Sequence, residues 1–246
     1  MKYNSIAQVG PPRSGSTLIY NIFRNIFKDM NVKKTHLPFY DSFNKLFGGL
    51  EEPVLYAVSI RHPYNCILSL MDFRELTLES AIKSYMRYGG ERLIPFFDRF
   101  GGNHDNLILF YYEDFFNNTE NIFDVIESKL DMKIDSDIKS NIIEEWGIES
   151  VIEKVNNFGD EHIHVGKGRD GDSFQYIWDS ETHLNPNHIS QRKGNTHFTE
   201  LLTDGEIDKI KKEGRINDIV NYFYPLPSPE HPYGWNGDER NKKRSF

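Results

Sequence analysis

Three short apolar runs, each close to a segment with helical periodicity, constrain the fold of this chain most strongly. The runs occupy residues 5–9, 54–60 and 106–112. The second run, VLYAVSI, is almost continuously apolar, which is typical of a strand that is covered on both faces. Strands that alternate with helices favour a parallel sheet. The sequence therefore predicts an α/β fold in which helices flank a central parallel sheet.

Apolar residues at three- and four-residue spacing predict the helices. One helix spans residues 17–27, and another starts at the His62-Pro63 pair that ends the second strand. Further helices are expected at residues 77–97, 119–130, 135–146, 204–212 and 216–222. Together these elements predict one domain over residues 1–224, followed by an extended or disordered tail at residues 225–246.

Residues 156–194 are rich in Gly, Asp, Asn and His and show no sustained period. A segment of this length without regular structure is usually a functional loop or lid, so we expect it to cover a binding site. Its Glu161-His162-Ile163-His164 run pairs two histidines, but the sequence offers no third ligand at a diagnostic spacing. No metal site is predicted.

The charge balance limits the classes of partner. The chain has 37 Asp and Glu against 29 Lys and Arg, a net charge of −8, which argues against a nonspecific nucleic-acid binder. Any anion site must therefore be local. Cys66 is the single cysteine, and the start MKYNSIAQ lacks the order of a secretory signal, which favours a reducing, cytoplasmic setting. No apolar run approaches the roughly 18 residues that span a bilayer.

The stretch VGPPRSGSTLIYNIF, residues 9–23, joins the first strand to the first helix. It offers a fixed cation, Arg13, and a glycine, Gly15, where the backbone can approach a ligand closely. Hydroxyl groups and N–H groups at the helix N-terminus come from Ser14, Ser16 and Thr17. This is the chemistry of an oxyanion cradle, although an ordinary helix cap would use the same residue types. The loop lacks the lysine of a P-loop NTPase.

The stretch resembles the phosphosulfate-binding loop of sulfotransferases that use 3′-phosphoadenosine 5′-phosphosulfate (PAPS). Four further motifs follow in the family's order, so the resemblance runs from Val9 to about Tyr224. It implies a sulfotransferase fold, similar to that of P-loop NTPases, and transfer of a sulfuryl group from PAPS to an acceptor hydroxyl or amine. The nucleotide product is PAP, and no metal is required. Residues 13–17 would hold the 5′-phosphosulfate.

The second motif, KTHLP at residues 34–38, is similar to the catalytic-base segment of cytosolic sulfotransferases. The resemblance makes His36 the base and Lys34 a contact for the transferred group. Arg13 stands where those enzymes carry lysine, and a guanidinium stabilises charge rather than donating a proton. Few residues separate Thr17 from His36, far fewer than in the animal enzymes, so the family's acceptor pocket cannot be carried over.

The third and fourth motifs follow the second and third predicted strands. Arg61 and Ser69, eight residues apart, resemble the family's 3′-phosphate-binding element, although a strand-end arginine can also form an ordinary surface ion pair. Tyr112, in the run YYED, resembles the tyrosine that lies near the adenine. A buried tyrosine at a strand end is common, so this motif is weak by itself.

The fifth motif, Arg192-Lys193-Gly194, resembles the Arg-Lys-Gly that also grips the 3′-phosphate. The family usually continues with a further Gly and a Trp, whereas here Asn195 follows at once, so the loop is shortened. The dimer-forming segment of the cytosolic relatives is not evident after it, which leaves the oligomeric state open.

Two other classes stay open at the level of sequence. A P-loop nucleotide kinase or NTPase would share the strand–loop–helix unit but would need the missing lysine and Mg²⁺. A noncatalytic nucleotide-binding module would keep Arg61, Ser69 and Arg192 but would have no use for His36. The acceptor is not identified by the sequence, and carbohydrates, small alcohols, lipids and peptides are all candidates.

Overall fold

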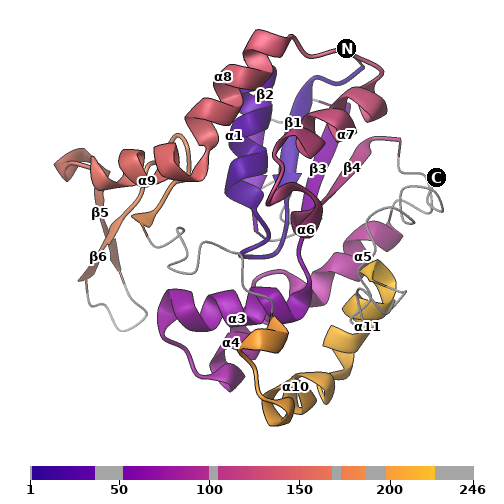
Figure 1. Cartoon of the computed structure of the whole chain (residues 1–246), viewed down its shortest axis with the longest axis vertical. Coiled ribbons are helices and arrows are strands. Elements are labelled where there is room, and N and C mark those ends of the chain that lie inside the picture. Colours follow the sequence, from indigo (N-terminus) through magenta and orange to yellow (C-terminus); the bar gives the residue numbers. More distant parts are fainter. Residues whose placement is uncertain (1, 37–51, 100–104, 168–172, 187–197, 225–246) are drawn as a thin grey trace.

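The computed structural model describes residues 2–36, 52–99, 105–167, 173–186 and 198–224. Its centre is a four-stranded parallel sheet, as predicted (Figure 1). The strands lie in the order β2-β1-β3-β4. Their bounds are Ser5–Val9 for β1, Asn31–Thr35 for β2, Val54–Ile60 for β3 and Leu107–Tyr111 for β4.

Side chains of the central strands alternate between two hydrophobic cores, one on each face of the sheet. In β3, Leu55 and Ala57 pack into one core, while Val54, Val58 and Ile60 pack into the other. All five side chains are almost completely buried. Full burial of a large aliphatic side chain contributes about 1.5–3 kcal/mol, so β3 is stabilised from both faces. The prediction of a strand covered on both faces is confirmed.

Helices cover both faces of the sheet (Figure 1). One core is closed by α1 (Ser16–Ile26), α7 (Glu120–Leu130), α8 (Ser136–Trp146) and α9 (Ile148–Asn156). The other is closed by α3 (Pro63–Arg74), α4 (Leu78–Arg87), α5 (Leu93–Asp98), α10 (Asp204–Lys211) and α11 (Gly214–Phe223). The short helix α6 (Tyr112–Phe115) follows β4 directly.

The strand order creates a switch point between β1 and β3. From β1 the chain moves to β2 on one side and then returns to β3 on the other side. In open sheets of this kind, ligands bind outside the carboxyl ends of the strands at such a point. The register brings the strand ends together, because Val9 lies opposite Thr35 on one side and opposite Val58 on the other. The loop after β1 is therefore the expected centre of a site.

Two predictions about the helices and loops were wrong, and two elements were not predicted. Residues 77–97 do not form one helix, because the chain breaks at Gly89, which has φ 145°, and makes a 3₁₀ turn over Gly90–Arg92. Residues 31–35 and 148–156 form a strand and a helix that were not predicted. Residues 156–194 are not without structure, because β5 (Ile163–Lys167) and β6 (Ser173–Ile177) form an antiparallel hairpin. The predicted tail at 225–246 lies outside the described residues.

Candidate functional site

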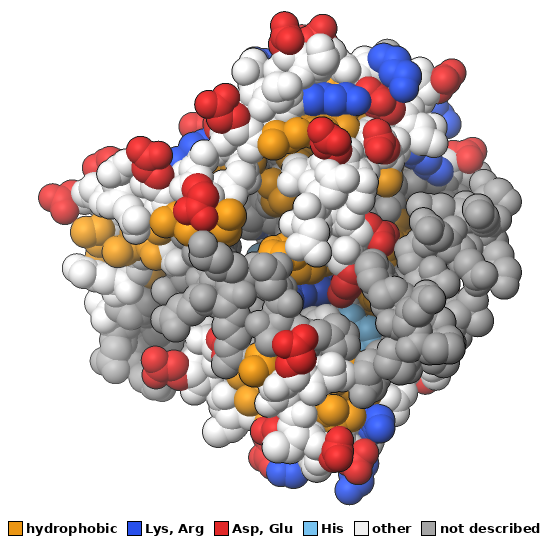
Figure 2. Space-filling view, in the orientation of Figure 1, with side chains coloured by type: hydrophobic (Ala, Val, Ile, Leu, Met, Phe, Trp, Pro, Cys, Tyr) orange, Lys and Arg blue, Asp and Glu red, His pale blue; other side chains and the backbone are white. Residues whose placement is uncertain are grey.

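A cavity of about 540 Å³ opens at the carboxyl ends of the sheet strands. Figure 2 shows a hollow near the middle of this face, in which basic and hydrophobic side chains are visible. Of the residues predicted from the sequence, the cavity walls include Arg13, Gly15, Ser16, Thr17, His36, Arg61, Ser69 and Tyr112. Residues that lie up to 99 positions apart, from Arg13 to Tyr112, are thus brought to one place by the parallel sheet.

The loop after β1 owes its shape to two glycines. A Cβ atom on Gly10 would lie 2.5 Å from the carbonyl oxygen of Ser59. Gly15 has φ 78° and begins α1, and a Cβ there would lie 2.7 Å from the ring of Phe115. Gly15, the N-cap of α1, has no side chain to cap the first turn, and N–H groups at a helix start suit an anion.

Ser14 holds the loop in place. Its hydroxyl is fully buried and donates a hydrogen bond to the carbonyl of Pro11 at 2.7 Å. It also lies 2.9 Å from the hydroxyl of Ser59 on β3. The side chain of Ser14 is thus used within the protein. The prediction that Ser14 contacts the ligand now depends on its backbone N–H.

Arg13 lies between the loop and α3. Its backbone is left-handed, with φ 67°, a conformation that costs a residue other than glycine about 1–3 kcal/mol and tends to mark functional loops. Its Nε donates to the hydroxyl of Ser69 at 2.9 Å, and its guanidinium lies 4.8 Å from the ring centre of Phe73. Burial and then the charge of Arg61 lower the pKa of Arg13 to about 10, so Arg13 keeps its charge at neutral pH.

Arg61 is a buried cation with donor capacity left over. Only 8% of the residue is exposed, and its guanidinium lies 4.2 Å from the ring centre of Tyr112. One terminal nitrogen donates to the carbonyl of Arg13 at 3.4 Å. Its buried Nε finds no acceptor within the described part of the chain. A buried guanidinium that lacks a carboxylate is costly, and a phosphate group would satisfy it.

Lys34 and His36 come from the edge strand β2 and the residue beyond its end. The Nζ of Lys34 donates to the hydroxyl of Thr17 at 2.7 Å, and burial lowers the pKa of Lys34 to about 7. Burial, followed by the charge of Lys34, lowers the pKa of His36 to about 3, and the backbone of Gly10 acts in the opposite direction. His36 lines the cavity as a neutral imidazole, and its buried Nδ1 has no partner among the described residues.

The opposite end of the cavity is apolar. Its walls there come from the junction of α8 and α9 and from the segment after β4, namely Trp146, Gly147, Ile148, Val151, Phe115 and Phe116. The ring of Tyr112 stacks on Phe116 at 5.0 Å and lies between this end and Arg61. Sequence reasoning missed Ile148 and Val151 because α9 was not predicted, and it gave the other apolar residues no role. A tryptophan at a helix end, followed by glycine and a second amphipathic segment, was the available signal.

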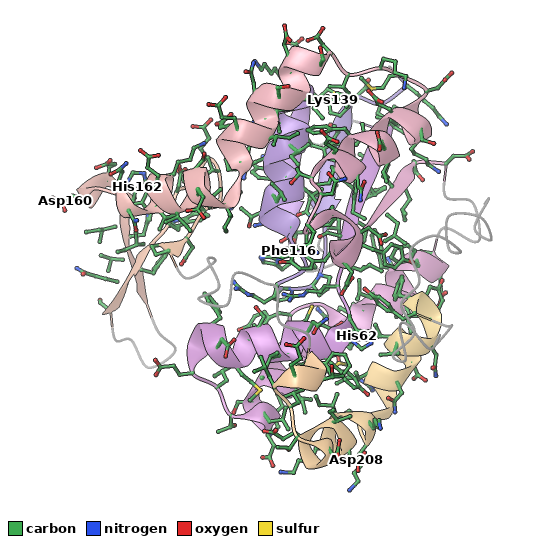
Figure 3. All side chains as sticks on the ribbon, in the orientation of Figure 1. His62, Phe116, Lys139, Asp160, His162 and Asp208 are labelled. Carbon is green, nitrogen blue, oxygen red and sulfur yellow. The ribbon has the colours of Figure 1, made fainter. Side chains whose placement is uncertain are left out.

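A second set of interactions joins the segments that follow β3 and β4. The Glu113 carboxylate accepts hydrogen bonds from the N–H of His62 at 2.8 Å and the hydroxyl of Tyr224 at 3.1 Å. His62 begins α3 (Figure 3), and its ring stacks on Phe198 at 5.1 Å. Asn65 accepts the N–H of Phe198 at 3.0 Å. Arg192, Lys193 and Gly194 lie outside the described residues.

Comparison with known proteins extends these observations. No protein family model matches the sequence, and no curated protein matches it. Among solved structures, the crystal structure of mouse sulfotransferase SULT7A1 complexed with PAP matches with a TM-score of 0.54. The match covers 85% of this chain and 82% of that chain, at 11% sequence identity. The fold is a sulfotransferase fold. At this identity the likeness concerns the fold alone.

Two further observations on the described residues concern membrane-spanning helices and groups of metal ligands. None of the helices in the described part of the chain is long and apolar enough to cross a membrane. Among the same residues, no group of three or more His, Cys, Asp or Glu side chains could hold a metal ion.

Proposed function

We propose that this protein transfers a sulfuryl group from PAPS to an acceptor hydroxyl or amine. One observation carries the proposal: the buried Arg61, the half-buried Arg13, a serine and a neutral histidine, from four different segments, line one cavity at the switch point of the sheet. The likeness of the fold to a sulfotransferase complexed with PAP supports the same activity.

The cavity has a place for each part of the nucleotide. Arg61 and Ser69 would bind the 3′-phosphate, since both offer donors to the same space and Nε of Arg61 lacks a partner among the described residues. Arg192, Lys193 and Gly194 would complete this group. The aromatic end around Tyr112 and Trp146 would hold the adenine. The N–H groups at the start of α1, with Ser14, Ser16 and Thr17, would cradle the 5′-phosphosulfate.

His36 would act as the general base of an in-line transfer. The acceptor oxygen or nitrogen forms a bond to sulfur, the bond from sulfur to the phosphate oxygen of PAPS breaks, and the acceptor proton passes to His36. Negative charge that develops on the leaving phosphate would be stabilised by Arg13, Lys34 and the loop N–H groups. The bound phosphosulfate anion would also raise the low pKa of His36, because it opposes the effect of Lys34.

Two further parts of the proposal concern the metal requirement and the cellular location. The loop supplies cationic groups without a Walker lysine, so we propose that turnover needs no metal. We place the protein in the cytoplasm. Burial raises the pKa of the Cys66 thiol to about 12, which makes this thiol unreactive.

A transfer assay tests the proposal. The purified chain is incubated with PAPS labelled on its sulfur and with a panel of phenols, alcohols, sugars, amines and tyrosine peptides, in the presence of EDTA. We expect label in at least one acceptor and release of PAP. Hydrolysis of ATP that depends on Mg²⁺, without any labelled acceptor, would instead favour the NTPase class.

A further inference from the structure

A second imidazole, that of His183, is close enough to Lys34 and His36 for their charges to interact. It belongs to the segment 179–185, which connects the hairpin β5–β6 to the cavity wall. The two residues that follow His183, Leu184 and Asn185, line the same cavity as His36. The sequence analysis gave His183 no role.

The segment 179–185 is fastened to one face of α1. The amide of Asn21 donates to the carbonyl of Thr17 at 2.9 Å and to that of Thr182 at 2.8 Å. Tyr20 donates through its hydroxyl to the carbonyl of Glu181 at 3.3 Å, and Arg24 donates to the same carbonyl at 2.8 Å. Helix α1 follows the loop after β1 and also holds the segment 179–185. The position of His183 is therefore fixed relative to Thr17.

The segment also closes on itself, which fixes the backbone of His183. The Asp179 carboxylate accepts the N–H groups of Glu181 and Thr182 at 2.7 and 3.1 Å. The N–H of His183 donates to the carbonyl of Asp179 at 2.9 Å. His183 has φ 57°, a left-handed conformation that is uncommon for a residue with a Cβ atom. The fold keeps a histidine where glycine would be less strained.

The ring of His183 is packed on two sides by aromatic rings. It meets the ring of Tyr20 edge-on at 4.9 Å and that of Trp178 at 5.2 Å. Within the described part of the chain, neither imidazole nitrogen has a hydrogen-bond partner. The charged and titratable groups that face the ring are Lys34, His36, Arg24, Asp179 and Tyr20.

We propose that His183 binds the acceptor, holding its hydroxyl between two imidazoles so that His36 can take the proton. This inference rests on the proposed function. A neutral imidazole offers one N–H donor and one lone pair, which matches a hydroxyl group better than a carboxylate or sulfate. The acceptor class is therefore an uncharged alcohol.

Two substitutions separate binding from packing. His183→Gly removes the imidazole but suits the left-handed backbone, and His183→Asn tolerates that backbone while keeping a donor and an acceptor. His162→Asn is the matched control, because His162 lies at the start of the same hairpin with its ring stacked on Phe158 at 4.2 Å (Figure 3). With 4-nitrophenol as the acceptor, assayed at about pH 6 so that most of its phenol group is uncharged, we expect His183→Gly to raise KM about tenfold or more. PAP affinity should stay within about twofold, since no donor to the nucleotide is lost.

His183→Asn should recover part of the acceptor affinity, and His162→Asn should behave as wild type. If His183→Gly lowers the thermal midpoint but leaves KM for 4-nitrophenol unchanged, His183 is only a packing residue and the inference is wrong.

A binding measurement keeps this test independent of turnover. Histidine ring signals of the full chain in complex with PAP are followed by NMR while 4-nitrophenol is added. We expect the signals of His36 and His183 to shift together, and that of His162 to stay in place. If both shift but no PAPS transfer occurs, the proposed function fails while the acceptor site stands. A shift of His36 alone, or of neither ring, would overturn the inference.

Discussion

Arg13 donates a hydrogen bond from Nε to the hydroxyl of Ser69 at 2.9 Å, and this contact joins the loop after β1 to helix α3. The sequence resemblance assigns these two residues to opposite ends of PAP. In the structure they share one cavity with Arg61, whose guanidinium donates to the carbonyl of Arg13. The two ends of the proposed nucleotide site are therefore connected, and a substitution at one end should alter ligand binding at the other.

PAP should bind at least about tenfold more tightly than 5′-AMP, because charge-assisted hydrogen bonds to the 3′-phosphate contribute about 1.5–3 kcal/mol each. Arg61→Ala should remove most of this preference. Arg215→Ala is the control, since its side chain is 73% exposed and pairs with Glu91 at the surface. Calorimetry with both nucleotides measures the difference, and equal affinities in the wild type would contradict the assignment of Arg61 and Ser69.

PAP affinity should increase as the pH falls through about 7, because Lys34 has a pKa of about 7 in the structure and gains its positive charge below that value. Binding of the dianionic end of PAP should therefore be accompanied by proton uptake near neutral pH. Lys34→Met should flatten the pH dependence between about 6 and 8. Calorimetry in buffers with different ionisation enthalpies detects the proton. If the PAP affinity of Lys34→Met still depends on pH in this range, a group other than Lys34 takes up the proton.

Lys34→Met should also stabilise the fold. Burial holds the pKa of Lys34 below its usual value of 10.5, so the folded state binds a proton less readily than the unfolded state. This penalty is fully present below about pH 7 and disappears as the pH rises towards 10.5. At pH 7 we expect the thermal midpoint to rise by about 2–4 °C, the effect of roughly 1 kcal/mol in a chain of this size. A lower midpoint would show that the contact with Thr17 outweighs the burial of charge.

Gly15→Ala should weaken PAP binding and destabilise the protein. A left-handed backbone costs alanine about 1–2 kcal/mol, and the added Cβ would lie 2.7 Å from Phe115. Gly205→Ala is the matched control, because nothing lies within 4 Å of a Cβ at that position in α10. It should be neutral or stabilising by up to about 1 kcal/mol. If the two variants have equal denaturation midpoints and equal PAP affinities, the position of Gly15 does not require a residue without a Cβ atom.

Sequence reasoning found the parts of the sheet that are buried on both faces. The apolar run of β3 and the strand–loop–helix unit around Gly15 carry strong local patterns, and the structure confirms both. The edge strand β2 was missed because its sequence NVKKT is polar and half-exposed, which leaves little apolar pattern to detect. Its end carries His36, so the resemblance located a site residue whose supporting strand was not predicted.

The acceptor side was harder to predict because long-range contacts hold it together. His183 is placed by hydrogen bonds from α1 to a segment about 160 residues away, and no local pattern encodes them. One signal was present: Thr17, Asn21 and Arg24 form a polar stripe along α1 at spacings of four and three residues. A polar stripe on a helix whose other faces are buried indicates that this face contacts another segment of the chain. The break at Gly89 was likewise hidden by helical periodicity on both sides.

The most direct measurement compares His36→Ala and Arg61→Ala in two assays, PAP affinity and sulfuryl transfer. His36 supplies a base but no donor to the nucleotide, so His36→Ala should bind PAP within a few-fold of wild type. It should lower transfer by roughly 10²–10⁴, the usual contribution of a positioned general base. Arg61→Ala should instead weaken PAP binding by about 1.5–3 kcal/mol. Near-normal turnover by His36→Ala with a good acceptor would contradict the proposed mechanism, and Glu113 would then be the next carboxylate to test.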